Sequence, residues 1–121
     1  MEKQKTILVV DDSLTTLFLI KKMLEKRGYN IIQAKTGQES LDIVKKQTPD
    51  LVLLDIMLPD IPGDTVFFQL KESYPKIKVI LISSLALSER TIDDLIGAGL
   101  VGFMRKPLTE EELLKKLNSV I

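Results

Sequence analysis

Cysteine and histidine are both missing from this chain of 121 residues. Without cysteine the chain has no disulfide framework and no thiol chemistry, which suits a reducing cytoplasm. Without histidine it lacks the most common general base, the most common zinc ligand and any internal phosphohistidine. Candidate catalytic or metal-binding residues must therefore be sought among other side chains.

Charge of one sign and long hydrophobic runs are missing as well. Seventeen basic residues balance seventeen acidic ones, so bulk charge implies neither nucleic-acid binding nor attraction to a membrane. No apolar run approaches the roughly 20 residues of a membrane span, and the polar start Met1–Lys5 does not resemble a signal peptide. With 45% hydrophobic residues, the composition predicts one globular domain, which we expect to span residues 1–121 in the cytoplasm.

Five short apolar runs alternate with five longer segments of helical periodicity. The runs, which we expect to form strands, are Thr6–Val10, Asn30–Ala34, Leu51–Leu54, Lys78–Ile82 and Val101–Arg105. Helices are expected after Ser13, from Gly37 to Gln47, from about Asp64 to Tyr74, after Ser88 and after Thr109. This alternation predicts an α/β fold in which a doubly wound parallel sheet carries helices on both faces.

The first predicted helix has an apolar stripe that we assign to Leu14, Leu17, Phe18 and Leu24, and Gly28 is expected to stop this helix.

Polar side chains follow four of the five predicted strands. Asp11–Asp12 follow the first strand, Asp55 the third, Ser83–Ser84 the fourth and Lys106 the fifth. The carboxyl ends of parallel strands meet at one edge of the sheet, where ligands bind in doubly wound folds. Crowded carboxylates repel unless a cation joins them, and oxygen ligands without histidine or cysteine favour Mg²⁺. This edge is therefore a candidate magnesium and phosphate site, in which a carboxylate can be the nucleophile.

Four blocks of the sequence are together similar to the signature of response-regulator receiver domains. They are LVVDDS at Leu8–Ser13, LVLLDIMLPDIPG at Leu51–Gly63, VILISS at Val79–Ser84 and GFMRKPL at Gly102–Leu108. The blocks occur in the order and spacing of that family, and the resemblance covers the whole chain. It implies a flavodoxin-like sheet of five parallel strands in the order 2-1-3-4-5 with five helices.

The resemblance also implies a magnesium site and a phosphorylated residue. Asp55 would accept the phosphoryl group. Asp12, Asp55 and the backbone carbonyl of Met57 would bind Mg²⁺ directly, whereas Asp11 would act mainly through a metal-bound water.

Further roles follow from the same resemblance. The Ser83 hydroxyl and the Ser84 backbone N–H would contact the phosphoryl group, and Lys106 would pair with it. The Lys106–Pro107 bond would be cis. Phe103 would be the switch aromatic, which turns inward together with a movement of Ser83 on activation.

The expected function is a phospho-accepting switch of a two-component system rather than an enzyme that acts on other substrates. The donor would be a sensor histidine kinase or a histidine phosphotransfer protein. A downstream protein target would bind the face of the fourth helix, fifth strand and fifth helix, and no direct contact with nucleic acid or membrane is expected. Met57 and Leu85 would flank the phosphoryl group. Because neither can orient an attacking water, we hypothesise slow self-dephosphorylation.

Three alternative functions share the predicted fold. Mg²⁺-dependent aspartyl-phosphate phosphatases and phosphomutases typically carry Asp-x-Asp after the first strand and a substrate-covering cap, whereas this chain has Asp11–Asp12 and no residues for a cap. A flavodoxin-like cofactor binder would need a phosphate-cradling loop where Asp11–Ser13 stand. A pseudo-receiver would bind partners without phosphorylation, and the intact set of acidic, hydroxyl and lysine residues argues against it.

Overall fold

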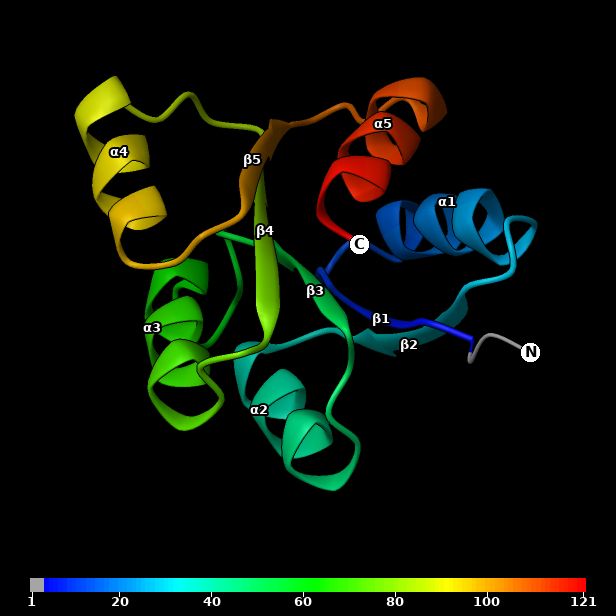
Figure 1. Cartoon of the computed structure of the whole chain (residues 1–121), viewed down its shortest axis with the longest axis horizontal. Helices are drawn as coiled ribbons and strands as arrows, with labels where there is room; N and C mark the ends of the chain where they lie inside the picture. Colours follow the sequence, from blue (N-terminus) through cyan, green and yellow to red (C-terminus); the bar gives the residue numbers. More distant parts are fainter. Residues whose placement is uncertain (1–3) are drawn as a thin grey trace.

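Strands and helices alternate along the chain in a computed structural model that describes residues 4–121 (Figure 1). The strands are β1 (Thr6–Val10), β2 (Asn30–Ala34), β3 (Leu51–Asp55), β4 (Lys78–Ser83) and β5 (Gly102–Arg105). The helices are α1 (Leu14–Glu25), α2 (Gly37–Lys46), α3 (Gly63–Ser73), α4 (Glu89–Gly97) and α5 (Glu110–Val120). The predicted order is confirmed, and the predicted element ends that differ from the structure differ by one residue. The first three residues of the domain predicted for 1–121 lie outside the described part.

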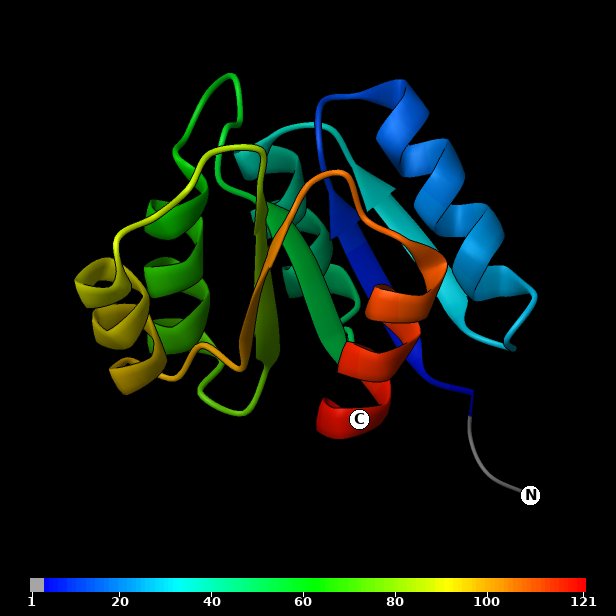
Figure 2. The same cartoon turned by 90° about the horizontal axis from the view of Figure 1, so that it is seen from above.

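The five strands form one parallel sheet in the order β2-β1-β3-β4-β5, which confirms the predicted fold class. Helices α1 and α5 cover one face, and α2, α3 and α4 cover the other (Figures 1 and 2). Strand side chains alternate between these two layers. Leu8 and Val10 pack toward α2, α3 and α4, whereas Ile7 and Val9 pack toward α1 and α5. Burial on both faces explains why β1, β3 and β4 are continuous apolar runs, whereas the edge strands β2 and β5 are partly exposed.

The apolar stripe predicted for α1 is only partly correct. Leu17 and Leu24 are buried together with Ile20, but Leu14 and Phe18 are 64% and 58% exposed. Buried positions spaced three and four residues apart lie on one line of a helix, and Phe18 is rotated about 100° from Leu17. Its ring lies instead under the ammonium of Lys22, at 5.6 Å.

Three helices begin at the predicted hydroxyl caps. The side chains of Ser13, Ser88 and Thr109 each accept a hydrogen bond from the backbone N–H three residues later, at 3.1–3.2 Å. After α1, Gly28 adopts a φ of +90°, a conformation that favours glycine. None of the helices among residues 4–121 has the length and apolar character needed to cross a bilayer.

Candidate functional site

The polar residues predicted at the strand ends do meet at the carboxyl edge of the sheet. In the parallel register Val10 lies opposite Leu54, and Ser83 lies opposite Arg105, so neighbouring strands end at about the same height. One carboxylate oxygen from each of Asp11, Asp12 and Asp55 lies within 4.8 Å of the others. The buried sheet therefore holds three acidic groups close together at its rim.

Lys106 lies between two of these carboxylates. Its Nζ is 2.7 Å from Asp11 Oδ2 and 3.1 Å from Asp55 Oδ2. Asp11 is fully buried and Asp55 is 3% exposed, whereas 20% of the Lys106 side chain remains accessible. Ion pairs in such dry surroundings are strong, but one ammonium offsets only one of the three negative charges. The cluster therefore retains an excess of negative charge.

The oxygen atoms of this cluster fit a divalent cation. Asp11 Oδ1 accepts from Ser13 N at 2.9 Å, and Asp55 Oδ1 accepts from Met57 N at 3.1 Å. In the described part of the chain, the buried Asp11 Oδ2 accepts no regular hydrogen bond and is left with its ion pair to Lys106. A set of ligand atoms made of oxygen alone, with more negative charge than Lys106 offsets, suits Mg²⁺.

Burial and charge shift the protonation of the site. Burial raises the pKa of Asp55, with the neighbouring Asp11 adding to the effect, while the Met57 N–H and Lys106 partly offset it. For Lys106, burial alone would lower the pKa, but its contacts with Asp11 and Asp55 outweigh this and raise it. The ammonium is therefore held in its charged form, whereas the ionised form of Asp55 is disfavoured.

The first prediction concerns stability without metal. Asp55→Asn is expected to stabilise the protein by about 1 kcal/mol, or about 4 °C in Tm, because the neutral amide removes the cost of burying a charge and the smaller repulsion with Asp11. The raised pKa means that the folded protein binds the Asp55 proton more tightly than the unfolded chain does. The gain should therefore be larger at pH 7 than in acid: it shrinks as the pH falls through the raised pKa and is gone below the ordinary pKa of an aspartate.

Thermal unfolding of wild type and Asp55→Asn in EDTA, followed by circular dichroism at pH 7 and in acid, measures this difference. A variant that is no more stable at pH 7, or equally favoured at both pH values, contradicts the electrostatic account of the site.

The two serines predicted for the site differ in their surroundings. Ser83 is fully buried, and its Oγ accepts from Leu85 N at 3.0 Å, so its hydroxyl hydrogen is free to donate. Its carbonyl accepts from Lys106 N at 2.9 Å, which ties the ends of β4 and β5 together. Ser84 is exposed, and its carbonyl accepts from the Arg105 guanidinium at 3.3 Å. The Lys106–Pro107 bond is cis, the isomer that the resemblance implies.

Phe103 lies apart from this cluster. It is half-buried in β5 opposite Leu81, two residues before Ser83, on the face that α4 covers. The structure therefore brings Asp11, Asp12, Asp55 and Lys106 together at one rim and leaves Phe103 on the flank of the sheet.

The segment between β3 and α3, residues 56–62, contains a contact that the sequence analysis missed. The carboxylate of Asp60 accepts from the backbone N–H groups of Gly37 and Gln38, the first two residues of α2. No local sequence pattern predicts this contact, because the two partners of Asp60 lie 23 and 22 residues away in the sequence.

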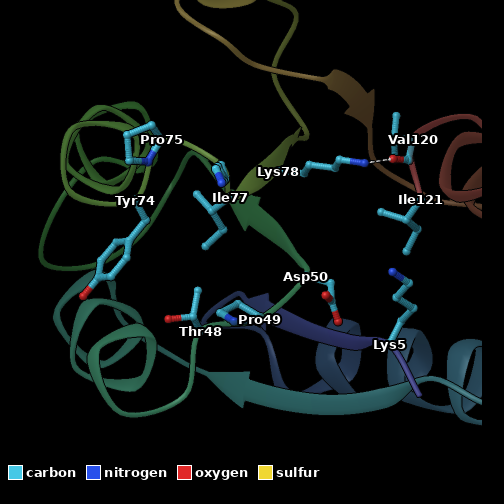
Figure 3. Close-up of a pocket in the computed structure, with 11 residues that line it drawn as sticks. Lys5, Thr48, Pro49, Asp50, Tyr74, Pro75, Ile77, Lys78, Val120 and Ile121 are labelled. Atoms are coloured by element: carbon cyan, nitrogen blue, oxygen red, sulfur yellow. Dashed lines mark hydrogen bonds between the residues drawn. The ribbon is translucent and has the colours of Figure 1, made fainter. Parts of the chain in front are cut away.

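A hollow of about 720 Å³ lies at the opposite, amino edge of the sheet, away from Asp11, Asp12 and Asp55 (Figure 3). Pro49 and Ile77 line it, and Lys78 Nζ donates a hydrogen bond across one side to the Val120 carbonyl. Its lining includes no residue of the acidic cluster, so we place the functional site at the carboxyl edge.

The site thus combines a parallel sheet with clustered aspartates, a buried serine and a lysine at its carboxyl edge. The family model described as "Response regulator receiver domain" matches residues 7–118. Protein PilH from Pseudomonas aeruginosa is 33% identical over 119 residues, which are 95% of this chain and 96% of PilH. The chemotaxis protein CheY from Bacillus subtilis is 30% identical over 116 residues, again 95% and 96% of the two chains.

Solved structures agree with these relatives. A chain from the CheX–CheY–BeF₃–Mg²⁺ complex of Borrelia burgdorferi superposes with a TM-score of 0.90 and 32% identity, covering 96% of this chain and 88% of that one. The present chain belongs to the family of response-regulator receiver domains, the CheY-like signalling modules of two-component systems.

Proposed function

We propose that this chain is a phospho-accepting switch that takes a phosphoryl group on Asp55 from the phosphohistidine of a sensor kinase or a histidine phosphotransfer protein. The observation that carries the proposal is the buried Asp55 carboxylate, which lies beside Asp11 and 3.1 Å from Lys106 Nζ. A buried carboxylate next to a fixed cation and a candidate metal site has the surroundings of a nucleophile for phosphoryl transfer. We place this function in the cytoplasm.

Each residue of the cluster has a defined task in the transfer. An Asp55 oxygen attacks the phosphorus, the new P–O bond forms, and the P–N bond to the donor histidine breaks. Lys106 Nζ pairs with the phosphoryl oxygens as negative charge spreads over them. Asp11, Asp12, Asp55 and the Met57 carbonyl would hold Mg²⁺, which when bound offsets charge on the same oxygens. The CheX–CheY complex of Borrelia burgdorferi contains Mg²⁺ and BeF₃, which supports this assignment.

The switch begins at Ser83 in this proposal. Because Ser83 Oγ accepts from Leu85 N, its free hydrogen can turn toward a phosphoryl group on Asp55, with the Ser84 N–H as a second donor. A shift of Ser83 moves the segment before α4 and makes room for the half-buried Phe103 to turn inward. The face formed by α4, β5 and α5 then changes its affinity for a downstream protein target.

The second prediction tests this route. Phosphorylation is expected to shift the NMR amide signals of Phe103 and of Ile92 in α4, because both lie on the proposed path from Ser83. Heteronuclear spectra with and without acetyl phosphate measure the change, and Lys45 and Lys46 at the carboxyl end of α2 serve as the reference. Unchanged signals at Phe103 and Ile92 in a phosphorylated sample contradict the route.

The third prediction concerns the lifetime of the phosphorylated state. Met57 and Leu85 are 56% and 52% exposed and flank the phosphoacceptor with apolar side chains that cannot orient a water. Met57→Asn supplies an amide there, and we expect self-dephosphorylation to become about 10-fold faster. Met57→Leu is the matched control, which should hydrolyse at the wild-type rate. Equal rates for Met57→Asn and wild type contradict the idea.

The proposal as a whole is tested by locating the phosphoryl group. After incubation with acetyl phosphate and Mg²⁺, peptide mapping is expected to find modification in the segment that contains Asp55. The same sample is given p-nitrophenyl phosphate, since we propose that the chain catalyses only its own phosphorylation and dephosphorylation. Steady turnover of this monoester would favour the phosphatase alternative, and modification elsewhere would contradict the role of Asp55.

A further inference from the structure

Asp60 joins two elements that are distant in the sequence. Its Oδ1 accepts a hydrogen bond from Gly37 N at 2.8 Å, and its Oδ2 accepts one from Gln38 N at 2.9 Å. The next backbone N–H of α2, that of Glu39, donates to the Thr36 hydroxyl at 3.0 Å. The first N–H groups of a helix have no partner within the helix and favour negative charge. These bonds, first of all that from Gln38, hold the pKa of Asp60 below its ordinary value, so the carboxylate stays charged.

The packing beneath this contact is close enough to require a glycine. A Cβ at Gly37 would lie 2.9 Å from Val66 Cγ2, 3.1 Å from Ile61 Cβ and 3.4 Å from Asp60 Oδ1. The amino end of α2 is therefore seated directly on the β3–α3 segment and on the first turns of α3. The short distances and the two hydrogen bonds are independent signs that these elements are fixed to each other.

The β3–α3 segment also carries the Met57 carbonyl proposed as a metal ligand. Its ends are held, because Gly63 N donates to Ile56 O at 2.8 Å, and a Cβ at Gly63 would come within 2.1 Å of Asp55 O. Between these ends, the bonds of Asp60 are the hydrogen bonds that tie residues 57–61 to α2. Met57 N and Leu58 N also bond within the segment, to Asp55 Oδ1 and Ile56 O, so Asp60 adds the link that ties this stretch to a second element.

We infer that Asp60 is a positioning residue, which anchors the β3–α3 segment to α2 so that the Met57 carbonyl is held beside Asp55 in a conformation ready for Mg²⁺. The inference rests on the proposed function. Asp60 itself touches neither the metal nor the phosphoryl group. Without the anchor the segment samples other conformations. The apparent Mg²⁺ affinity is then the intrinsic affinity multiplied by the fraction of molecules in which the Met57 carbonyl is in place.

Mg²⁺ titration of the full chain by calorimetry tests the inference. Asp60→Asn puts an amide N–H₂ against a backbone N–H and should weaken Mg²⁺ binding about 10-fold, as loss of an outer support of a metal ligand typically does. The matched control is Asp64→Asn, which removes the same charge from an exposed residue whose carboxylate, among residues 4–121, accepts from Thr65 N alone. Gly37→Ala separates the same surfaces without changing charge and should weaken binding in the same direction.

A second readout separates positioning from general stability. The rate of phosphorylation by acetyl phosphate should fall in Asp60→Asn at low Mg²⁺ and return to the wild-type rate at saturating Mg²⁺, measured well below the Tm. Equal Mg²⁺ affinities of Asp60→Asn and Asp64→Asn would overturn the inference while the proposed function stands. Absence of Mg²⁺ binding in wild type would overturn the proposed function and the inference with it.

Discussion

Asp12→Asn is expected to weaken Mg²⁺ binding about 100-fold, because it removes the charge of a proposed metal ligand. Loss of a residue that only supports a ligand typically weakens metal binding about 10- to 100-fold, so we expect the upper end of that range here. An Asp12 oxygen lies within 4.8 Å of oxygens of Asp11 and Asp55, yet the residue is exposed, so the fold should tolerate the change. Phosphorylation at millimolar Mg²⁺ should fall in parallel. This is the fourth prediction, and calorimetric titration measures the affinity.

The control for Asp12→Asn is Asp93→Asn, an equal loss of charge at an exposed position of α4. It should leave Mg²⁺ affinity unchanged. If Asp12→Asn binds Mg²⁺ as tightly as wild type while Tm and spectra are normal, the three carboxylates do not form the metal site and the account fails at that point.

The fifth prediction is that Lys106→Met changes metal binding and phosphorylation in opposite directions. In the free protein Lys106 Nζ occupies Asp11 Oδ2 and Asp55 Oδ2, so its removal should let Mg²⁺ bind more tightly. The same removal takes away a fixed positive charge from the transferring phosphoryl group, which should slow phosphorylation about 100-fold.

Lys106→Arg keeps the charge and serves as the matched variant. It should show Mg²⁺ affinity close to wild type, with a smaller loss of rate than Lys106→Met. An unchanged phosphorylation rate in Lys106→Met at saturating Mg²⁺ contradicts the role assigned to this lysine. Unfolding would lower both the Mg²⁺ affinity and the phosphorylation rate, so it does not explain a higher affinity together with a slower rate.

The sheet and the rim of the site could be predicted because both depend on local patterns. A strand buried on both faces has a continuous run of apolar residues in the sequence. The residue after such a run lies at the carboxyl edge of the sheet, whichever strands are beside it. Asp55 and Lys106 are 51 residues apart in the chain, yet each is placed by its own strand and by the parallel register. The closeness of Asp55 and Lys106 could therefore be predicted by counting the strands in the sequence.

Contacts that depend on how two elements meet were not predictable in the same way. The exposure of Leu14 and Phe18 is decided by the side of α1 that rests on the sheet, and the apolar spacing allowed more than one side. The bonds from Asp60 to α2 depend on the path of an irregular segment for which the sequence offers no period. The exposed apolar residues of α1 and the link between the β3–α3 segment and α2 were therefore found only in the three-dimensional arrangement.

Intact mass after incubation with acetyl phosphate, with Mg²⁺ or with EDTA, on wild type and Asp55→Asn, tests the central claim most directly. We predict a single phosphoryl adduct on wild type in Mg²⁺ and none in EDTA or on Asp55→Asn. The variant itself should remain folded, since the change removes a repulsion rather than a contact of the core. An adduct on Asp55→Asn, or none on a wild type that demonstrably binds Mg²⁺, would contradict phosphorylation of Asp55 as the activity of this chain.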